Sequence, residues 1–463
     1  MKSFSLLSLL GLLALPMIPA RAQSPGDPAP FRLVMLDPGH FHAALLQKGM
    51  YPQIDPNVRV YAPKGADVQE HLKRVNAYNS RATDPTQWKA TTYTGPDFFA
   101  RLLHEKAGNV VVMSGNNRDK PARILPIVEA GLDVLADKPM VIEPDGFPAL
   151  EHAFAAAQAK GAILYDIMTE RSEITNLLQR EFALQRNVFG QLATGTPENP
   201  AVVMESVHYY FKTVSGAALK RPAWFFDVTQ SGEGISDVGT HLVDLVQWEC
   251  FPDQAIDHTK DIEIISARRW PTTLTPAQFK TVTGLGTFPD YLRPTVKDGA
   301  LAVFATNEVS YRIKGIHAKV IARWDYEAVP GTGDTHYSLL RGTKCNLVIR
   351  QGAAENHQPT LYLEAAEDTD PLTFRRVLLP ALLEIQRKYP GVDVLPMETS
   401  WKIVIPPQYH VGHEAHFAAV IERFLGYLRT RQLPAWEVPN MLAKYSTTTR
   451  AVELARRNPQ GTP

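Results

Sequence analysis

The stretch Phe31-Arg-Leu-Val-Met-Leu36 followed by Asp37-Pro38-Gly39 decides the fold, because an apolar run of strand length ends abruptly at a turn. A second apolar run, residues 58–61, also ends at a turn, Pro63-Lys-Gly65. Between the two runs, residues 43–48 have the composition of a helix. Strand, helix and strand in this order indicate a β-α-β unit, the building block of a parallel sheet.

The alternation of strand and helix continues as far as residue 170. The expected helices are 97–106, 122–130 and 148–160, and the expected strands are 109–113, 133–136 and 162–165. Short apolar strands separated by helices are typical of a parallel sheet that is covered on both faces. The sequence therefore predicts an α/β fold with a Rossmann-like, doubly wound domain over residues 30–170.

Beyond residue 173 the pattern changes to longer segments in which apolar and polar residues alternate. These segments are 202–211, 303–313, 316–324, 347–350 and 361–365. A period of two indicates strands with one wet face, which are common in antiparallel sheets. We therefore expect an α+β domain with a large, mainly antiparallel sheet over 171–435, and a C-terminal helix and tail over 436–463. Near the end, 414–431 and 441–456 have helical patterns.

The first 22 residues have the features of a secretory signal peptide. Lys2 gives a positive charge, residues 4–18 form an apolar run, and Ala20-Arg-Ala22 has the small residues that a signal peptidase requires. The apolar run is shorter than the roughly 20 residues that a membrane-spanning helix needs. We expect cleavage after Ala22, export, a periplasmic location and no membrane association of the mature chain.

Composition limits the class of partner. The chain of 463 residues carries 48 basic and 48 acidic residues, so it offers no net field for nucleic acid or an anionic membrane. A small-molecule partner is therefore expected. The only cysteines are Cys250 and Cys345, which cannot form a network of disulfides, and two unpaired thiols are the preferred interpretation.

The turn after the first strand, Asp37-Pro-Gly-His-Phe-His42, occupies the position where open α/β sheets bind ligands. A dinucleotide site normally has Gly-x-Gly-x-x-Gly here, and only Gly39 of these glycines is present. A metal ion shared by His40, His42 and Asp37 is a rival interpretation, and a structural turn is another. On these residues alone we expect no metal.

Two further features carry possible chemistry. Lys138, in Asp137-Lys-Pro139, follows a strand and can meet a ligand at the end of the sheet, although a solvated surface lysine has the same appearance. Asp237 and His241 are four residues apart, which places them on one face of a helix. A carboxylate beside an imidazole can orient it and stabilise its protonated form, as suits a general base, although buried structural pairs of this kind are common.

These motifs occur in the order found in the Gfo/Idh/MocA oxidoreductases, the family of glucose-fructose oxidoreductase and inositol dehydrogenase. Gly115-Asn-Asn117 resembles the family's turn after the fourth strand, and Asp137-Lys-Pro139 resembles its Glu-Lys-Pro motif. Asp237-x-Gly-x-His241 resembles its Asp-x-x-x-His motif. The layout of the closing sheet resembles an exported subgroup with its own C-terminal domain.

The resemblance implies an oxidoreductase that uses NAD or NADP. It implies that Lys138 contacts the substrate hydroxyl and the nicotinamide ribose, that His241 takes the hydroxyl proton, and that Asp237 orients the substrate or His241. The residues implied to lie along the cofactor are Asp37, Gly39, His40, Phe41, His42, Asn116, Asn117, Asp137 and Lys138. Two fingerprint glycines are replaced, and residues 61–64 bring no carboxylate for the adenosine ribose. Asp67 is a poor substitute and Lys64 favours a 2′-phosphate, so NAD and NADP remain open.

Candidate substrate residues are Arg171, Tyr209, Trp224 and Asp237. Tyr209 and Trp224 offer aromatic faces to a sugar ring, with buried packing as the alternative, and Arg171 has a surface salt bridge as its alternative. The expected substrate is a sugar or glycoside that is oxidised at a ring hydroxyl, with C3 as the first choice. The resemblance also allows a homo-oligomer formed through the C-terminal sheet.

Export adds one expectation, because free NAD is scarce outside the cytoplasm. The cofactor is then expected to be bound tightly and recycled within the site. One alternative is an NAD-using glycosidase or lyase of the same fold. The others are a non-catalytic sugar-binding protein and a metal-dependent hydrolase built on His40 and His42.

Overall fold

The computed structural model describes residues 30–214, 217–366 and 369–458. The predicted signal peptide, 1–22, lies outside the described residues. Among the helices in the described ranges, none combines the length and the apolar character required to cross a bilayer.

The N-terminal domain contains a six-stranded parallel sheet. Its strands are β1 (Leu33–Leu36), β2 (Asn57–Tyr61), β3 (Lys89–Tyr93), β4 (Val110–Met113), β5 (Asp133–Asp137) and β6 (Leu164–Ile167). They lie in the order β3-β2-β1-β4-β5-β6, which is the order of a dinucleotide-binding fold. Every residue of β1, β4, β5 and β6 is buried, which explains the continuous apolar runs of β1 and β4. The other two strands also bury aspartates, which are Asp133 and Asp137 in β5 and Asp166 in β6. The predicted Rossmann-like domain is confirmed.

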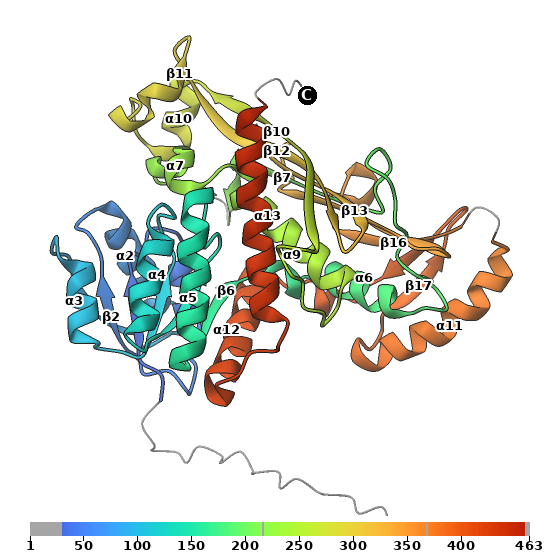
Figure 1. Ribbon diagram of the computed structural model, residues 1–463, viewed down its shortest axis with the longest axis horizontal. Coiled ribbons are helices and arrows are strands. Elements are labelled where there is room, and N and C mark those ends of the chain that lie inside the picture. The colour runs from blue at the N-terminus through green and yellow to red at the C-terminus, as the bar shows by residue number, and fades with distance from the viewer. Residues whose placement is uncertain (1–29, 215–216, 367–368, 459–463) are drawn as a thin grey trace, which may run out of the picture.

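Helices connect these strands and cover the sheet (Figure 1). They are α1 (His42–Leu45), α2 (Ala66–Ser80), α3 (Phe98–Glu105), α4 (Lys120–Glu129) and α5 (Phe147–Lys160), with the 3-10 turns η1 (Leu46–Lys48) and η2 (Pro144–Gly146). The sequence did not predict α2 or β3. Only Val68, His71 and Val75 of α2 are buried, and four of the five residues of β3 are exposed, so neither segment has a strong apolar pattern.

The second domain contains a large mixed sheet. Its strands are β7 (Val202–Phe211), β10 (Ile262–Leu274), β11 (Val296–Lys297), β12 (Ala300–Ile313), β13 (Ile316–Glu327), β14 (Thr335–Arg341), β15 (Cys345–Arg350), β16 (Thr360–Ala365), β17 (Asp393–Pro396) and β18 (Trp401–Val404). A separate small hairpin pairs β8 (Thr213–Val214) with β9 (Ala217–Ala218). Neighbouring strands of the large sheet are antiparallel except β7 and β13, which run parallel. The expectation of a mainly antiparallel sheet is therefore confirmed, with one parallel pair at its centre.

The remaining helices follow β6 in the chain, and some of them flank the large sheet while others pack against the first domain. They are α6 (Ile174–Leu184), α7 (Val228–Ser231), α8 (Gly234–Asp237), α9 (Gly239–Cys250), α10 (Pro276–Thr283), α11 (Pro371–Lys388), α12 (His413–Thr430) and α13 (Glu437–Arg457). The short 3-10 turns are η3 (Glu170–Ser172), η4 (Ala223–Phe226), η5 (Asp290–Thr295), η6 (Ala353–Glu355) and η7 (Pro407–Tyr409). The long helix α13 runs between the two sheets in Figure 1.

The C-terminal helices correct the expected domain limits. Phe417, Val420, Ile421 and Phe424 of α12 belong to the same apolar core as the six-stranded sheet, although the sequence assigned this helix to the second domain. The chain therefore leaves the first domain after β6 and comes back to complete its core. A sequence pattern shows that a helix has an apolar face, but it does not show which sheet that face covers.

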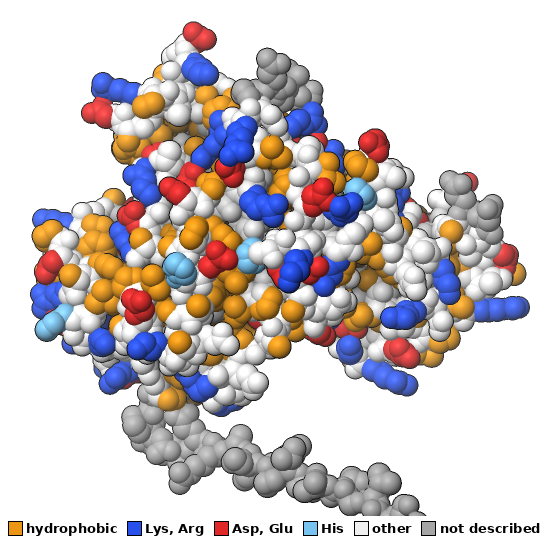
Figure 2. Space-filling view, in the orientation of Figure 1, with side chains coloured by type: hydrophobic (Ala, Val, Ile, Leu, Met, Phe, Trp, Pro, Cys, Tyr) orange, Lys and Arg blue, Asp and Glu red, His pale blue; other side chains and the backbone are white. Residues whose placement is uncertain are grey.

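The surface and the cysteines agree with the composition. In Figure 2, basic and acidic side chains are interspersed over both domains on the visible face. Cys250 and Cys345 are both free thiols, as preferred from the sequence, and Cys345 is buried while Cys250 is partly exposed.

Candidate active site

The turn between β1 and α1 keeps the shape of a nucleotide-binding turn despite its altered residues. Asp37 stands where the first glycine of the fingerprint would be, and it has a φ of 50°, a left-handed conformation that aspartate tolerates. A Cβ on Gly115, in the turn after β4, would lie 2.1 Å from the carbonyl oxygen of Asp37. The two turns are therefore in close contact at the point where the strand order reverses, the usual ligand position of such sheets.

Gly39 faces a cavity between the two domains. A Cβ at this position would lie 2.9 Å from Oδ2 of Asp67, at the start of α2. Trp224 of η4 donates from Nε1 to the same oxygen at 2.9 Å. The cavity is lined by Gly39, His40 and Asp67 on one side and by Arg221 and Phe225 of the second domain on the other. Trp224 thus lies beside the nucleotide-binding turn, a position that the sequence did not predict.

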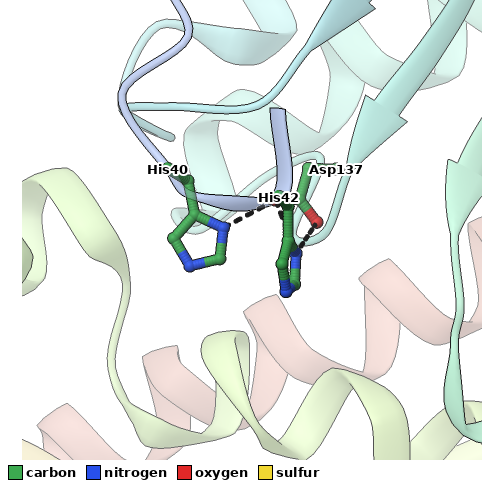
Figure 3. Close-up of side chains that lie close together, drawn as sticks. All are labelled: His40, His42 and Asp137. Carbon is green, nitrogen blue, oxygen red and sulfur yellow. Dashed lines mark hydrogen bonds and ion pairs between the residues drawn. The ribbon is translucent and has the colours of Figure 1, made fainter. Parts of the chain in front are cut away.

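Asp137, at the end of β5, binds both histidines of the turn (Figure 3). Nδ1 of His40 lies 3.1 Å from Oδ2, and Nδ1 of His42 lies 3.1 Å from both carboxylate oxygens. Ser114 also donates to Oδ2, at 2.8 Å. On its other side, Nε2 of His42 lies 3.0 Å from Nε2 of His413, the first residue of α12.

Asp37, which the rival metal interpretation had placed with the two histidines, instead forms an ion pair with Arg123 at 2.8 Å. The carboxylate that joins His40 and His42 is Asp137. Burial tends to raise the pKa of Asp137, but the two imidazoles outweigh it and hold that pKa well below its usual value. Burial lowers the pKa of His40 to about 4, with a further contribution from His42.

Lys138 pairs with Asp237 across the boundary between the two domains. Nζ of Lys138 lies 2.7 Å from Oδ1 of Asp237 and donates to its main-chain oxygen at 3.0 Å. Burial tends to raise the pKa of Asp237, and the nearby Lys138 ammonium reverses this and lowers it. The side chain of Lys138 is only 10% exposed, so it is not the solvated surface lysine of the alternative interpretation.

His241 differs from its expected arrangement. Asp237 ends α8 and His241 lies in α9, and the carboxylate of Asp237 bonds to Lys138 rather than to the imidazole. Burial, assisted by the charge of Lys138, holds the pKa of His241 well below its usual value. Nδ1 of His241 is buried and has no hydrogen-bond partner among the described residues. The imidazole is therefore neutral near pH 7, and the hydrogen-bonding capacity of its buried Nδ1 is not satisfied by any described residue.

Asn116 and Asn117 fasten the second domain to the end of β4. Asn116 donates to the side chain of Gln230 at 2.6 Å, and Asn117 donates to the main-chain oxygen of Ser231 at 2.7 Å. Lys120 donates to the side-chain oxygen of Asn117 at 2.6 Å. Both asparagines lie beside the site, where the sequence predicted cofactor contacts, and their side chains meet α7.

The comparisons with known proteins identify the family. Residues 178–456, more than half of the chain, match the family described as "Putative oxidoreductase C terminal domain". The chain belongs to this family of oxidoreductases. A crystal structure described as a "putative oxidoreductase" from Parabacteroides merdae is 50% identical, with a TM-score of 0.92 over 94% of this chain and 99% of that chain. No curated protein matches.

More distant structures share the fold of this oxidoreductase. Levoglucosan dehydrogenase in complex with NADH and levoglucosan is 12% identical, with a TM-score of 0.56 over 93% of this chain and 98% of that chain. KijD10, a 3-ketoreductase from Actinomadura kijaniata in complex with NADP, is 13% identical, with a TM-score of 0.54 over 92% and 97%. At this level of identity, the two structures show that the chain shares their overall fold.

Two of the substrate residues proposed from the sequence, Tyr209 and Arg171, have different surroundings in this oxidoreductase. Tyr209 lies on β7, where its main-chain nitrogen donates to Asp334 at 3.3 Å, and its side chain is partly exposed. Arg171 is a correction, because it lies in a buried ion cluster with Asp244 and Glu437. Its side chain is 2% exposed and both of its partners are carboxylates, so it forms a buried ion cluster and not the surface salt bridge of its alternative interpretation.

Sequence reasoning missed His208 and Asp334. His208 precedes Tyr209 on β7, and its Nδ1 lies 3.2 Å from Oδ2 of Asp334. His208 makes a minor contribution to the lowered pKa values of Asp237 and His241. Asp334 lies in the loop after β13, 126 residues along the chain from His208, so no local motif connects the two.

Two histidines, His71 and His336, make the stability of the oxidoreductase depend on pH. Burial lowers the pKa of His71 to about 4 and that of His336 to about 4. Both are neutral in the folded chain, whereas the unfolded chain binds a proton near pH 6.5. Above pH 6.5 the two histidines do not reduce the free energy of unfolding. As the pH decreases from 6.5 toward 4, that free energy falls by about 1.4 kcal/mol per pH unit for each histidine.

Thermal denaturation between pH 7.5 and 4.5 checks this dependence. We expect His71→Leu to flatten the decrease in melting temperature, because one buried histidine no longer takes up a proton on unfolding. The matched control is His104→Leu, which removes an exposed histidine and leaves the profile unchanged. Equal profiles for the His71→Leu variant and the parent protein would contradict the prediction.

Proposed function

We propose that this chain is an NAD(P)-dependent oxidoreductase that acts on a ring hydroxyl of a sugar or glycoside, with the C3 hydroxyl as the first position to test. The observation that carries the proposal is the buried Lys138–Asp237 pair next to His241, whose Nδ1 has no partner in the described part of the chain. These groups lie at the carboxyl end of a Rossmann sheet, beside the nucleotide-binding turn. The solved levoglucosan dehydrogenase and 3-ketoreductase complexes of the same fold support a nicotinamide cofactor and a sugar-like substrate.

The residues present fit a dinucleotide. A Cβ on Gly39 would meet Asp67, and a Cβ on Gly115 would meet the main chain of Asp37. The two turns therefore present backbone without side chains at the point where the strand order reverses, and a dinucleotide can approach that backbone closely. When bound, the nicotinamide ring supplies the acceptor for a hydride from the substrate carbon. Gly39 and Asp67 would lie along the adenosine half, and Lys138 along the nicotinamide half.

The chain's own residues handle the proton of the reacting hydroxyl. Lys138 uses two of its three donors on Asp237, which leaves one for the substrate oxygen. Its positive charge stabilises the developing alkoxide, and Asp237 holds the ammonium in place. His241 accepts the hydroxyl proton in its neutral form, which is the form that its lowered pKa maintains.

We infer that NAD is preferred to NADP. Asp67 lies at the nucleotide-binding turn, and Trp224 fixes one of its oxygens at 2.9 Å. A carboxylate in this place accepts a hydrogen bond from the 2′-hydroxyl of the adenosine ribose and repels a 2′-phosphate. Lys73 and Arg74 of the same helix pair with Glu70, which reduces their attraction for a phosphate.

Export motivates the remaining part of the proposal, a tightly bound cofactor. The predicted signal peptide would take the chain to the periplasm, where a cofactor lost from the site is not replaced. Two outcomes of catalysis fit such a site: recycling by a second substrate, or reoxidation within one cycle, as in a glycosidase or lyase. The release of an aglycone with no net change in the nucleotide would favour the second outcome.

Mass spectrometry of the mature protein tests the function directly. We expect denaturation to release close to one NAD per chain, and we expect a panel of pyranoses and glycosides to convert the bound nucleotide to its reduced form. A released 2′-phosphate nucleotide would overturn the inference about NAD. A preparation without nucleotide, which also fails to bind added NAD or NADP, would overturn the proposed function.

A further inference from the structure

The inference concerns His40, His42 and Asp137, which lie together at the ends of β1 and β5 (Figure 3). Each offers one ligand atom, and these atoms all lie within 4.8 Å of one another. We propose that these three side chains form a binding site for one first-row divalent metal ion, for which Zn²⁺ is the probe. This inference goes beyond the proposed function, since it depends only on the geometry of the three residues.

The spacing of the ligand atoms agrees with a tetrahedral ion. Zn²⁺ lies about 2.0–2.2 Å from imidazole nitrogen and carboxylate oxygen, so two ligand atoms of a tetrahedron are about 3.3 Å apart. Oδ2 of Asp137 lies 3.1 Å from Nδ1 of His40 and 3.1 Å from Nδ1 of His42. Two edges of the tetrahedron are therefore already formed, and the third joins the two histidines, whose ligand atoms lie within 4.8 Å of each other.

His413 supports His42 from outside the cluster. Its Nε2 lies 3.0 Å from Nε2 of His42, the nitrogen opposite to the proposed ligand atom. If Nε2 of His42 donates this hydrogen bond, its Nδ1 presents a lone pair to an ion. Ligating histidines usually have such a partner, which fixes the ring and the tautomer.

The site is accessible from one side only. The side chain of His40 is 21% exposed, whereas those of His42 and Asp137 are 6% and 4% exposed. His40 also lines the cavity beside Gly39 and Asp67. Three protein ligands leave at least one coordination position free, and it would face this cavity, as in zinc sites that bind a water or substrate oxygen.

A competing arrangement contains no ion. In it, both imidazoles donate from Nδ1 to Asp137 and His413 donates to His42, so the same three residues form a hydrogen-bonded cluster. Lys138 is adjacent and positively charged, although its pairing with Asp237 offsets that charge. The two arrangements predict different results when Zn²⁺ is added, because only the first binds the ion at these three residues. This difference can be measured without any substrate.

The experiment uses the mature protein, prepared without a polyhistidine tag and stripped with a chelator, with its nucleotide content recorded. Zn²⁺ is titrated by calorimetry, and bound metal is counted by elemental analysis. We expect close to one Zn²⁺ per chain in the parent protein. Affinity should fall at least about 100-fold in His40→Ala and in Asp137→Asn, and about 10–100-fold in His413→Gln.

The matched control is His258→Ala, which removes a surface histidine that pairs with Glu151, and it should bind Zn²⁺ like the parent protein. Co²⁺ offers a second measurement, because its visible absorption bands change when an imidazole ligand is lost. His40 is the partly exposed member of the cluster, so His40→Ala retains the best chance of a native circular dichroism spectrum. Binding of much less than one Zn²⁺ by the folded parent protein would overturn the proposal. Equal binding by the folded His40→Ala and parent proteins would also overturn it.

Discussion

The Arg171→Met variant is expected to lose about 3–5 kcal/mol of the free energy of unfolding, because it leaves buried carboxylates without their counter-ion. Arg171 binds Asp244 at 2.6 Å and Glu437 at 3.1 Å, and all three side chains are at most 2% exposed. Burial tends to lower the pKa of Arg171, but the two carboxylates outweigh burial and raise that pKa well above its usual value. Urea denaturation followed by circular dichroism measures the effect.

The cluster joins the two domains, which is why one residue has so large an expected effect. Arg171 lies in η3 directly after the first domain, Asp244 in α9 and Glu437 at the start of α13. Lys444 of α13 extends the cluster by binding Asp244 at 2.8 Å and Asp166 of β6 at 2.7 Å. The cluster therefore connects the first sheet with the helices that carry His241.

Two controls separate buried charge from lost packing. Arg268 is a surface arginine whose side chain is 44% exposed and pairs with Glu308, so Arg268→Met should cost less than about 1 kcal/mol. The double variant Arg171→Met/Glu437→Gln should recover part of the loss, because one unpaired negative charge is removed with it. If Arg171→Met were as stable as Arg268→Met, the cluster would not hold the domains together.

The fold could be predicted where burial is complete on both faces. β1 and β4 are continuous apolar runs because every residue in them is buried, and each ends at a turn. The edge strand β3 and the mostly exposed α2 escaped prediction, since a segment with few buried positions has little apolar periodicity. α12 was predicted as a helix, but its partner sheet depends on a contact between residues far apart in the chain.

For the site, too, the sequence predicted residues that belong to local motifs and did not predict contacts between residues far apart in the chain. The turn that holds His40 and His42 and the lysine at position 138 could be located from local motifs at the ends of strands. The partners of these residues could not, because Asp137 meets the histidines across 95 and 97 residues and Lys138 meets Asp237 across 99. The pattern at Asp237 and His241 indicated a pair on one helix, and the break after α8 gives the carboxylate to Lys138 instead.

Lys138→Met is expected to reduce kcat/KM for sugar oxidation by about 10³-fold or more. Stabilisation of the developing oxyanion contributes about 10²–10³-fold and depends on this ammonium. Proton transfer to His241 contributes about 10²–10⁴-fold, and it requires that the same ammonium hold the hydroxyl in position. The side chain of methionine has a length similar to that of lysine and carries no charge, so the change removes the donors and leaves Asp237 unpaired. Reduction of the bound nucleotide by the active sugar of the panel measures the rate, and mass spectrometry shows whether the nucleotide is retained.

The surface variant Lys314→Met, which disrupts an exposed pair with Asp261, provides the control and should retain full activity. The Lys138→Met result also separates the competing functions. A metal-dependent hydrolase built on His40 and His42 would retain activity without Lys138, whereas the oxidoreductase would not. A folded Lys138→Met protein that retains its nucleotide and is within ten-fold of the parent rate would therefore remove Lys138 from the reaction. Loss of the rate with the nucleotide retained would place the ammonium of Lys138 at the reacting oxygen, since binding of the cofactor alone would then be unaffected.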